Sequence, residues 1–352
     1  DWQYCLVGSD MCIRDRPVDE YPGRSSREFH WGNTMKIDKT LKRAVAGSAL
    51  ALLAVSGSAV ADDHEATTTY KFGGYAKFDS MFTSYSDTTP DNNSLMRQFY
   101  FAPQVPVGDG TSDSDMTTDF QARETRLNFR VDHKTAGGSK VTAFVEFDFF
   151  TDSDANEVVS NSYEPRLRHA FIKYDNWTFG QTWSTFQDVA ALPEALDFVG
   201  PAESTTFIRQ SMIRYTTGNL ELAAENPQGF FPGGTARRDM NTVPDLIARY
   251  TFKMDGGSYI KLAGLVRSLK IEDQGSGSQA DATAWGVSAS TKLVMDNGDD
   301  LRAMVNYGDG IGRYVGLSFV LDGYIHDETG DIETAESLSW FVAYRHMWND
   351  KW

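Results

Sequence analysis

Basic side chains at every second position are the residues of this sequence best suited to chemistry. Arg126 and Arg130 alternate with apolar residues, so an extended segment would carry both guanidinium groups on one face. Arg166 and Arg168 are two positions apart and would also share one face of an extended segment. Guanidinium groups in a row attract an anion by charge and by directed N–H donors, and they need no covalent step to do so. The pattern predicts reversible contact with anions.

Residues for covalent catalysis are scarce. A hydrolase of the outer-membrane barrel type needs a serine and a histidine held together by a third group, and no serine here lies in a recognisable nucleophile setting. We therefore predict that the protein is not an enzyme and that His169 has a packing or interface role. Both cysteines, Cys5 and Cys12, precede residue 61, so the rest of the chain forms no disulfide and no cysteine-ligated metal site. The histidines after residue 61 are His64, His133, His169, His326 and His346.

Two other motifs are interpreted as ordinary loop sequence. The segment Gly-Asp-Gly-Ile-Gly at 308–312 is similar to a glycine-rich phosphate loop, but it follows a strand pattern and opens no helix, so a turn is predicted. The acidic groups at 113–115 and 327–331 are predicted to be solvated side chains rather than calcium ligands. No metal and no other cofactor is predicted.

The charge balance and the hydropathy pattern exclude several classes of protein. The 352 residues contain 33 lysines and arginines against 49 aspartates and glutamates, a formal net charge of −16. This balance argues against a nucleic-acid-binding protein, which must neutralise phosphates. No long apolar run occurs outside one N-terminal stretch, which excludes a helical membrane protein. A membrane β-barrel stays possible because its strands alternate apolar and polar residues.

The N-terminal stretch predicts export. Residues 35–61 contain a basic start, an apolar segment and an Ala-Val-Ala end, which together are typical of a secretory signal peptide. The exported chain is expected to begin at Asp62. Residues 1–34 lie upstream of this signal and are interpreted as an artefactual extension that takes no part in the fold.

From Asp62 onward, apolar and polar residues alternate with a period of two. In 140–151, for example, one face is wholly apolar and the other mainly polar. The alternation predicts an all-β fold of about twelve strands without helices. The windows are 70–85, 119–133, 140–151, 165–174, 177–185, 207–217, 219–225, 245–253, 258–268, 282–293, 300–307 and 337–348.

The predicted connections alternate between tight turns and long loops. An outer-membrane barrel has short periplasmic turns and long extracellular loops, whereas a secreted β-sandwich binding protein, the alternative, has no reason for this alternation. Trp285, Trp340 and Tyr344 near strand ends further favour a transmembrane antiparallel β-barrel over residues 62–352. The turns lie at 135–139, 175–176, 218–219, 254–257, 295–299 and 349–350, and the long loops at 86–118, 152–164, 186–206, 226–244, 269–281 and 308–336.

The cost of placing arginine in lipid assigns the basic residues to the barrel interior. An arginine on the lipid face near the midplane costs about 2–4 kcal/mol, so the polar side of each strand is predicted to face inward. On 165–174 the alternation is imperfect, and we place Arg166 and Arg168 inward with Lys173 outward, where its amino group can reach the interface. The acids concentrate in the long loops, so the predicted lumen is basic despite the acidic total. The predicted pore-lining residues are Arg126, Arg130, Arg166, Arg168, Arg214, Lys261, Arg267, Arg302 and Arg345.

The loop at 186–206 is predicted to fold into the barrel. It is too apolar for a solvated loop, with Phe186, Leu192 and Phe198 among its residues, and a loop of that length needs a surface to pack on. Folding inward would narrow the pore and bring four acids near the arginines. The alternative is a capping loop that packs on its neighbours outside the pore. The four acids are Asp188, Glu194, Asp197 and Glu203.

A set of short motifs runs from residue 72 to the end of the chain: Phe-Gly-Gly-Tyr at 72–75, Arg-Leu-Arg-His-Ala-Phe at 166–171, Tyr-Asp-Asn-Trp at 174–177, Phe-Gly-Gln-Thr-Trp-Ser-Thr-Phe at 179–186, Leu-Asp-Phe-Val-Gly-Pro-Ala-Glu at 196–203 and Ala-Tyr-Arg-His at 343–346. Together they resemble the DcaP-like trimeric porins of Gram-negative bacteria, from about Tyr70 to the last residue. The resemblance implies a sixteen-stranded trimeric barrel in the outer membrane, through which small anionic solutes, dicarboxylates among them, diffuse passively. It also implies that Arg166 and Arg168 are wall residues and that 186–206 is a constriction element.

Two departures from that family pattern are visible. Some members carry a helical coiled-coil segment before the barrel that is not seen in this sequence, and the windows give about twelve strands where the resemblance implies sixteen. Because Asn349 and Asp350 have turn composition, about four more strands are expected to follow Trp352 in the full protein. The predicted partners are outer-membrane lipid, small anionic solutes and further copies of the chain in a homotrimer. Nucleic acid is not a predicted partner.

Overall fold

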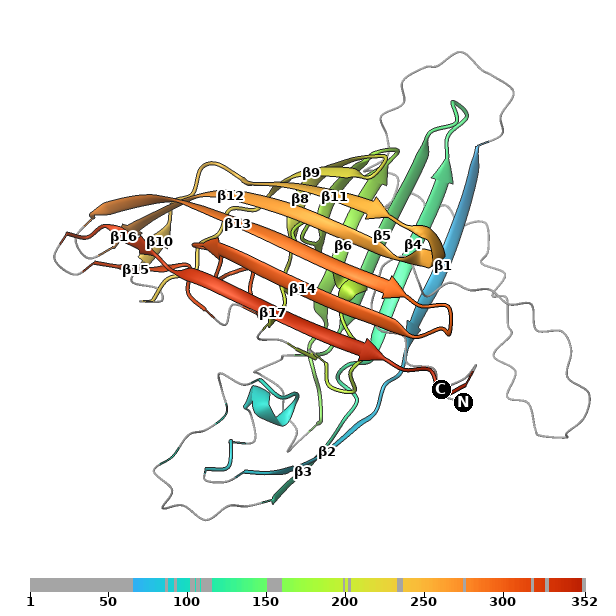
Figure 1. Cartoon of the computed structure of the whole chain (residues 1–352), viewed down its shortest axis with the longest axis horizontal. Coiled ribbons are helices and arrows are strands. Elements are labelled where there is room, and N and C mark those ends of the chain that lie inside the picture. Colours follow the sequence, from blue (N-terminus) through green and yellow to red (C-terminus); the bar gives the residue numbers. More distant parts are fainter. Residues whose placement is uncertain are drawn as a thin grey trace, which may run out of the picture.

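The computed structural model describes residues 66–349 apart from several short gaps, and its ordered elements are strands with short 3₁₀ turns (Figure 1). The predicted extension, the predicted signal peptide and Glu203 lie outside the described residues, as do the acids at 113–115 and residues 350–352. No helix within the described ranges is long and apolar enough to cross a membrane. The gaps are 86–87, 92–93, 102–104, 106–107, 109–115, 151–159, 199, 202–203, 233–236, 275–276, 318–319 and 327–328.

The elements follow one another in the order β1 (Thr67–Tyr75), β2 (Asp79–Ser84), η1 (Leu95–Arg97), β3 (Met116–Gln121), β4 (Arg126–Lys134), β5 (Lys140–Asp148), β6 (Arg166–Tyr174), β7 (Trp177–Trp183), η3 (Val189–Ala191), β8 (Arg209–Thr217), β9 (Leu220–Glu225), β10 (Arg237–Asp239), β11 (Asp245–Lys253), η6 (Asp255–Gly257), β12 (Tyr259–Asp273), β13 (Gln279–Val294), β14 (Asp300–Asp309), β15 (Gly323–Ile325), β16 (Ile332–Thr334) and β17 (Glu336–Arg345). One sheet runs through β1-β4-β5-β6-β7-β8-β9-β11-β12-β13-β14-β17, with β10 paired beside β12. All its pairs are antiparallel between strands close in sequence, which confirms the predicted fold class. Figure 1 shows the sheet curling from the blue β1 to the red β17.

Strand β17 shows most clearly that the outer face of this sheet is apolar and its inner face mostly small or polar. Trp340 is 63% exposed, and Leu338 and Val342 beside it are equally open, whereas Ser339 is 8% exposed. A water-soluble sandwich would bury the large apolar side chains and expose the serine. The reversed pattern is that of a strand with lipid on one side and the barrel interior on the other.

Two predicted windows each contain two strands, not one. The window 70–85 holds β1 and β2, and 119–133 holds β3 and β4, because the chain bends at Gly74. This glycine has φ +137°, and a Cβ there would lie 2.1 Å from the carbonyl oxygen of Arg126, so no other residue fits. Beyond the bend, β2 and β3 pair only with each other.

The prediction of a long loop at 269–281 is also wrong. Strand β12 runs 15 residues and β13 runs 16, and they stay paired up to the contact of Glu272 with Gln279. The outward-apolar pattern ends at 268 because Leu269 and Ile271, on the side of the buried Arg267, are themselves buried apolar residues. Figure 1 shows the hairpin projecting past its neighbours at the left.

Strands β1 and β17 are the two ends of the main sheet. Among the described residues, no backbone pairing joins them, and each has one neighbouring strand. The expectation of further strands after Trp352 stays a prediction.

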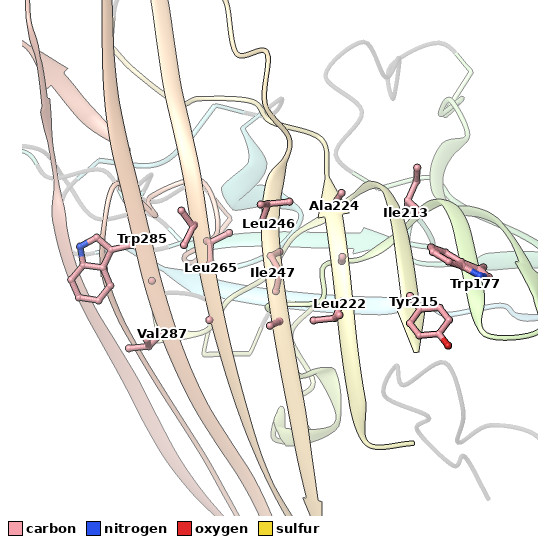
Figure 2. Close-up of a pocket in the computed structure, with 15 residues that line it drawn as sticks. Trp177, Ile213, Tyr215, Leu222, Ala224, Leu246, Ile247, Leu265, Trp285 and Val287 are labelled. Atoms are coloured by element: carbon pink, nitrogen blue, oxygen red, sulfur yellow. The ribbon is translucent and has the colours of Figure 1, made fainter. Parts of the chain in front are cut away.

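A hollow of about 860 Å³ lies across β7 to β13 on the membrane-facing side of the sheet (Figure 2). Its floor contains small residues, among them Ala248 and Gly264, and Trp177 and Trp285 stand at opposite ends. Neighbouring lining residues such as Leu246 are outward-facing and about half exposed. Its apolar lining therefore belongs to the membrane-facing surface, and the candidate site must be sought on the inner face.

Candidate functional site

A β-bulge in β6 brings Arg166 and Arg168 to the same side as their acidic neighbours on β5. Glu146 pairs with His169, but the next residue, Phe147, pairs with Leu167, so Arg168 is the extra residue of the bulge. Arg166 and Arg168 both lie on the inner face. Arg168 is 0% exposed, which makes it one of the largest fully buried side chains of the described chain.

The same bulge overturns the outward placement of Lys173. Beyond an extra residue the alternation of side chains is shifted by one, so every later position changes face. Lys173 pairs with Thr142 and the buried Thr178, and its amino nitrogen lies 5.6 Å from the ring centroid of Phe171. Lys173 is therefore on the inner face. A strict period of two would put Arg168 and Lys173 on opposite faces, so it cannot place both side chains inward.

Acids on the adjacent strand hold these two arginines. Asp148, fully buried, accepts hydrogen bonds from Arg166 at 2.7 Å and from Arg168 at 2.8 Å. Glu146 accepts a second one from Arg168 at 2.8 Å. Bidentate and shared contacts of this kind fix the planar guanidinium groups in direction, so any free N–H points to a defined place.

Three buried guanidinium nitrogens nearby have no hydrogen-bond partner among the described residues. They are Nε of Arg126, Nη2 of Arg168 and Nη1 of Arg209. The nearest acid to Arg126 is Glu124 at 3.6 Å, and Lys77 also pairs with that glutamate. A buried N–H without an acceptor is costly, so this group of donors is suited to an acceptor supplied from outside the chain.

Arg209 is the member of this group that the sequence patterns did not indicate. It opens β8 in register with Trp183, and its guanidinium carbon lies 4.8 Å from the centroid of that indole ring. Alternation along β8 puts Arg209 on the same face as Ile213, which points outward. The alternation therefore does not predict that Arg209 lies beside the other arginines. Only the packing of Trp183 inside the sheet, where Arg168 also approaches it, brings Arg209 to the site.

The loop between β7 and β8 lies against this arginine group through Phe198. The guanidinium carbons of Arg126, Arg166 and Arg168 lie 6.0, 5.6 and 5.9 Å from the Phe198 ring centroid. Phe198 also packs on Phe150 at 4.4 Å. Cation–π contacts on one face and aromatic packing on the other hold the ring beside the donors.

The rest of the loop crosses to the opposite wall. Asp188 caps η3 and accepts hydrogen bonds from Lys261 at 2.6 Å and from Ser290 at 2.8 Å. Glu194 lies 2.9 Å from Arg345 and 3.5 Å from Arg302. The described parts of 184–208 thus contact the inner face of the sheet at two separate places. In the capping alternative these residues would lie outside the pore.

Among the described residues, Asp197 differs from Asp188 and Glu194 because it forms no ion pair with a basic side chain. Its carboxylate accepts a long hydrogen bond of 3.4 Å from the backbone of Tyr100. Burial raises the pKa of Asp197 to about 6, and the nearby Lys77 opposes part of that rise.

The remaining predicted pore residues also lie on the inner face, each beside an acid. Arg130 pairs with Asp132 at 2.8 Å, and Arg214 lies 3.8 Å from Glu221. Arg302 pairs with Asp300 at 2.8 Å, and that aspartate also contacts Arg345. The prediction that acids concentrate in the loops is therefore wrong for the strands.

The surroundings of Arg267 differ from those expected for a residue that lines a pore. It is 1% exposed and contacts Asp245 at 3.0 Å and Asp322 at 2.8 Å. It also donates to the carbonyl oxygens of Gly310 and Gln228. Because these acceptors surround it, Arg267 holds chain segments together and has few N–H donors left for a solute.

The structure offers little for catalysis or metal binding. His169 is buried, contacts Thr182 at 3.1 Å and packs on Trp183, as expected for a packing residue. Within the described ranges, no group of three or more histidine, cysteine, aspartate or glutamate side chains could hold a metal ion. Among the described residues, the site presents charged N–H donors that can recognise an anion by its charge.

Comparison with protein families decides which proteins share this architecture. The family model described as DcaP outer membrane protein matches residues 62–352. The chain belongs to the DcaP outer membrane protein family. This DcaP family member is accordingly a protein of the bacterial outer membrane. Comparison with curated proteins gives no match.

Solved structures agree with the fold of this DcaP family member. The outer membrane channel DcaP of Acinetobacter baumannii is 22% identical, with a TM-score of 0.59 over 79% of this chain and 73% of that one. An anion-selective porin from Comamonas acidovorans is 14% identical, with a TM-score of 0.31 over 70% of this chain and 79% of that one. The first similarity supports the barrel fold, and the second is too distant to carry an argument.

Proposed function

We propose that this DcaP family member is a homotrimeric porin for the passive diffusion of small anionic solutes such as dicarboxylates. The observation that carries the proposal is the set of buried N–H donors on Arg126, Arg168 and Arg209 without acceptors. An anion that reaches them exchanges part of its hydration shell for directed, charge-assisted hydrogen bonds.

The acids beside the arginines are as important for transport as the arginines themselves. Asp148 and Glu146 already neutralise much of the charge of Arg166 and Arg168. A site with all its cations uncompensated would hold an anion too tightly for it to leave. Partial neutralisation therefore favours fast entry and fast release over tight binding.

Replacing Arg126 and Arg209 together by glutamine is expected to reduce anion preference. A charge-assisted hydrogen bond is worth about 1.5 kcal/mol, so we expect the ratio of chloride to potassium permeability to fall by up to about tenfold. The measurement is the reversal potential in a planar bilayer across a KCl gradient. Arg130→Gln is the matched control, because Arg130 pairs with Asp132 away from this donor group. A wild-type channel that prefers potassium over chloride would show that the proposal is wrong.

Anion preference is also expected to depend on pH through Asp197. With a pKa raised to about 6 by burial, this carboxyl is mostly charged at neutral pH and mostly neutral about one unit below 6. Losing one negative charge beside the arginine group should strengthen anion preference as the pH falls through 6. Asp197→Asn should have the low-pH reversal potential at both pH values. An unchanged pH dependence in that variant would assign the titration to another group.

A further inference from the structure

The described residues of 310–322, all but 318–319, lie inside the sheet, although the sequence patterns assign this segment to an extracellular loop. Ile311 and Tyr314 are 0% exposed, and Val315 is nearly so. They form one apolar cluster with Phe186 of the β7–β8 loop and with inward residues of β9, β11 and β12, such as Ile247. A loop in solvent would leave these side chains in water, so the segment is an inserted element.

This segment is joined directly to the β7–β8 loop by backbone hydrogen bonds. The amide of Phe207 donates to the carbonyl oxygen of Tyr314 at 3.1 Å, and the amide of Gly316 donates to that of Thr205 at 2.7 Å. Between them, Thr206 and Val315 face each other as an isolated antiparallel bridge. The two loops, about a hundred residues apart in sequence, are therefore paired inside the barrel.

Tyr314 ties the pair to the barrel wall. Its hydroxyl donates to Asp245 on β11 at 2.7 Å and accepts from the side-chain amide of Gln210 on β8 at 2.8 Å. Its ring packs edge-on against Phe186 with centroids 5.7 Å apart and lies 5.2 Å from the guanidinium carbon of Arg267. One side chain thus contacts two wall strands and the neighbouring loop.

The two glycines at the start of the segment let it turn inward. Gly310 has φ +72°, and a Cβ there would lie 2.5 Å from the Cβ of Ala284. At Gly312 a Cβ would lie 2.3 Å from the carbonyl oxygens of Val320 and Leu321. The predicted turn at 308–312 is only partly right, because Gly308 and Asp309 end β14 and the chain leaves the strand at Gly310. The lack of a side chain lets Gly310 pass close to β13 and lets Gly312 pass close to Val320 and Leu321.

We propose that residues 310–322 are a second pore-narrowing segment and that Tyr314 locks the β7–β8 loop in its position inside the barrel. The open conductance and its steadiness then depend on two paired loops. The proposal rests on the porin-type fold of the family and not on anion preference.

A disulfide across the bridge tests whether the loops stay paired. Residues 62–352 contain no cysteine, so Thr206→Cys with Val315→Cys adds the single possible pair there. Facing residues between two ladder hydrogen bonds have Cα atoms about 4.5 Å apart, within the range of a disulfide. In bilayer recordings, we expect the oxidised variant to keep the wild-type conductance and reversal potential and to show fewer transient closures than the reduced one. Failure to cross-link, or a large conductance change on oxidation, would overturn the proposal.

Removing the side chain of Tyr314 tests the lock itself. Tyr314→Ala should raise the conductance and the open-channel noise, and Tyr314→Phe should restore the conductance while leaving excess noise, since it keeps the ring but loses both hydroxyl contacts. In the oxidised cysteine background, both effects of Tyr314→Ala should disappear. Tyr324→Ala on the exposed β15 is the control. Wild-type conductance and noise in a Tyr314→Ala protein that still migrates as a folded barrel would overturn the proposal.

Discussion

Replacing residues 189–202 by a short glycine–serine linker is expected to raise the single-channel conductance by at least about twofold, because conductance follows the cross-section of the narrowest part of a pore. The described part of this loop reaches from Lys261 on β12 to Arg345 on β17 and places Phe198 against the arginines of β4 and β6. Removing it opens the space between those walls. Bilayer recordings of single channels in symmetric KCl measure the change.

The matched control for that variant is a deletion of 326–331 at the tip of the β15–β16 hairpin, whose ends meet through the hydrogen bond from His326 to Asp331. It should leave the conductance at the wild-type value. If the 189–202 variant folds as a barrel and conducts like the wild type, the loop does not narrow the pore. Because the replacement begins at residue 189, Asp188 and Gln187 keep the contacts of the loop base with Lys261 and Arg249.

Arg267→Met is expected to destabilise the folded barrel by about 3–5 kcal/mol, because it leaves Asp245 and Asp322 buried without their cation. Methionine fills much of the same space, so the loss reports charge and hydrogen bonding more than a cavity. The donors to the Gly310 and Gln228 carbonyl oxygens disappear with it. The midpoint temperature at which the folded band in a detergent gel converts to the unfolded band measures the effect.

Two further variants show where that loss originates. Arg130→Met removes the half-exposed pair with Asp132 and should cost less than about 1 kcal/mol. Adding Asp245→Asn and Asp322→Asn to Arg267→Met removes the uncompensated charges and should recover part of the stability. If Arg267→Met melts at the wild-type temperature, the buried cation does not hold 310–322 to the wall.

The sequence indicates the strands well because the burial of a strand in a membrane barrel is a local property. A side chain on β17 faces lipid or interior according to its own position in the alternation, so Trp340 and Ser339 could be assigned without knowing their neighbours. The cost of arginine in lipid places the nine predicted pore cations inward, and their role in the pore stays a prediction. The errors fall at Gly74, at the β6 bulge and at the end of β12, where one extra residue or one bend breaks the period.

The sequence by itself thus determined the fold class and the resemblance that the family match confirmed. Only the tertiary structure decided which acid holds each arginine, that Arg209 joins Arg126 and Arg168, and that 310–322 enters the barrel beside the β7–β8 loop. The physical reason is that alternation acts between neighbours in sequence. Ion pairing and loop insertion depend on strand register and on contacts between residues far apart in the chain, such as Thr206 with Val315.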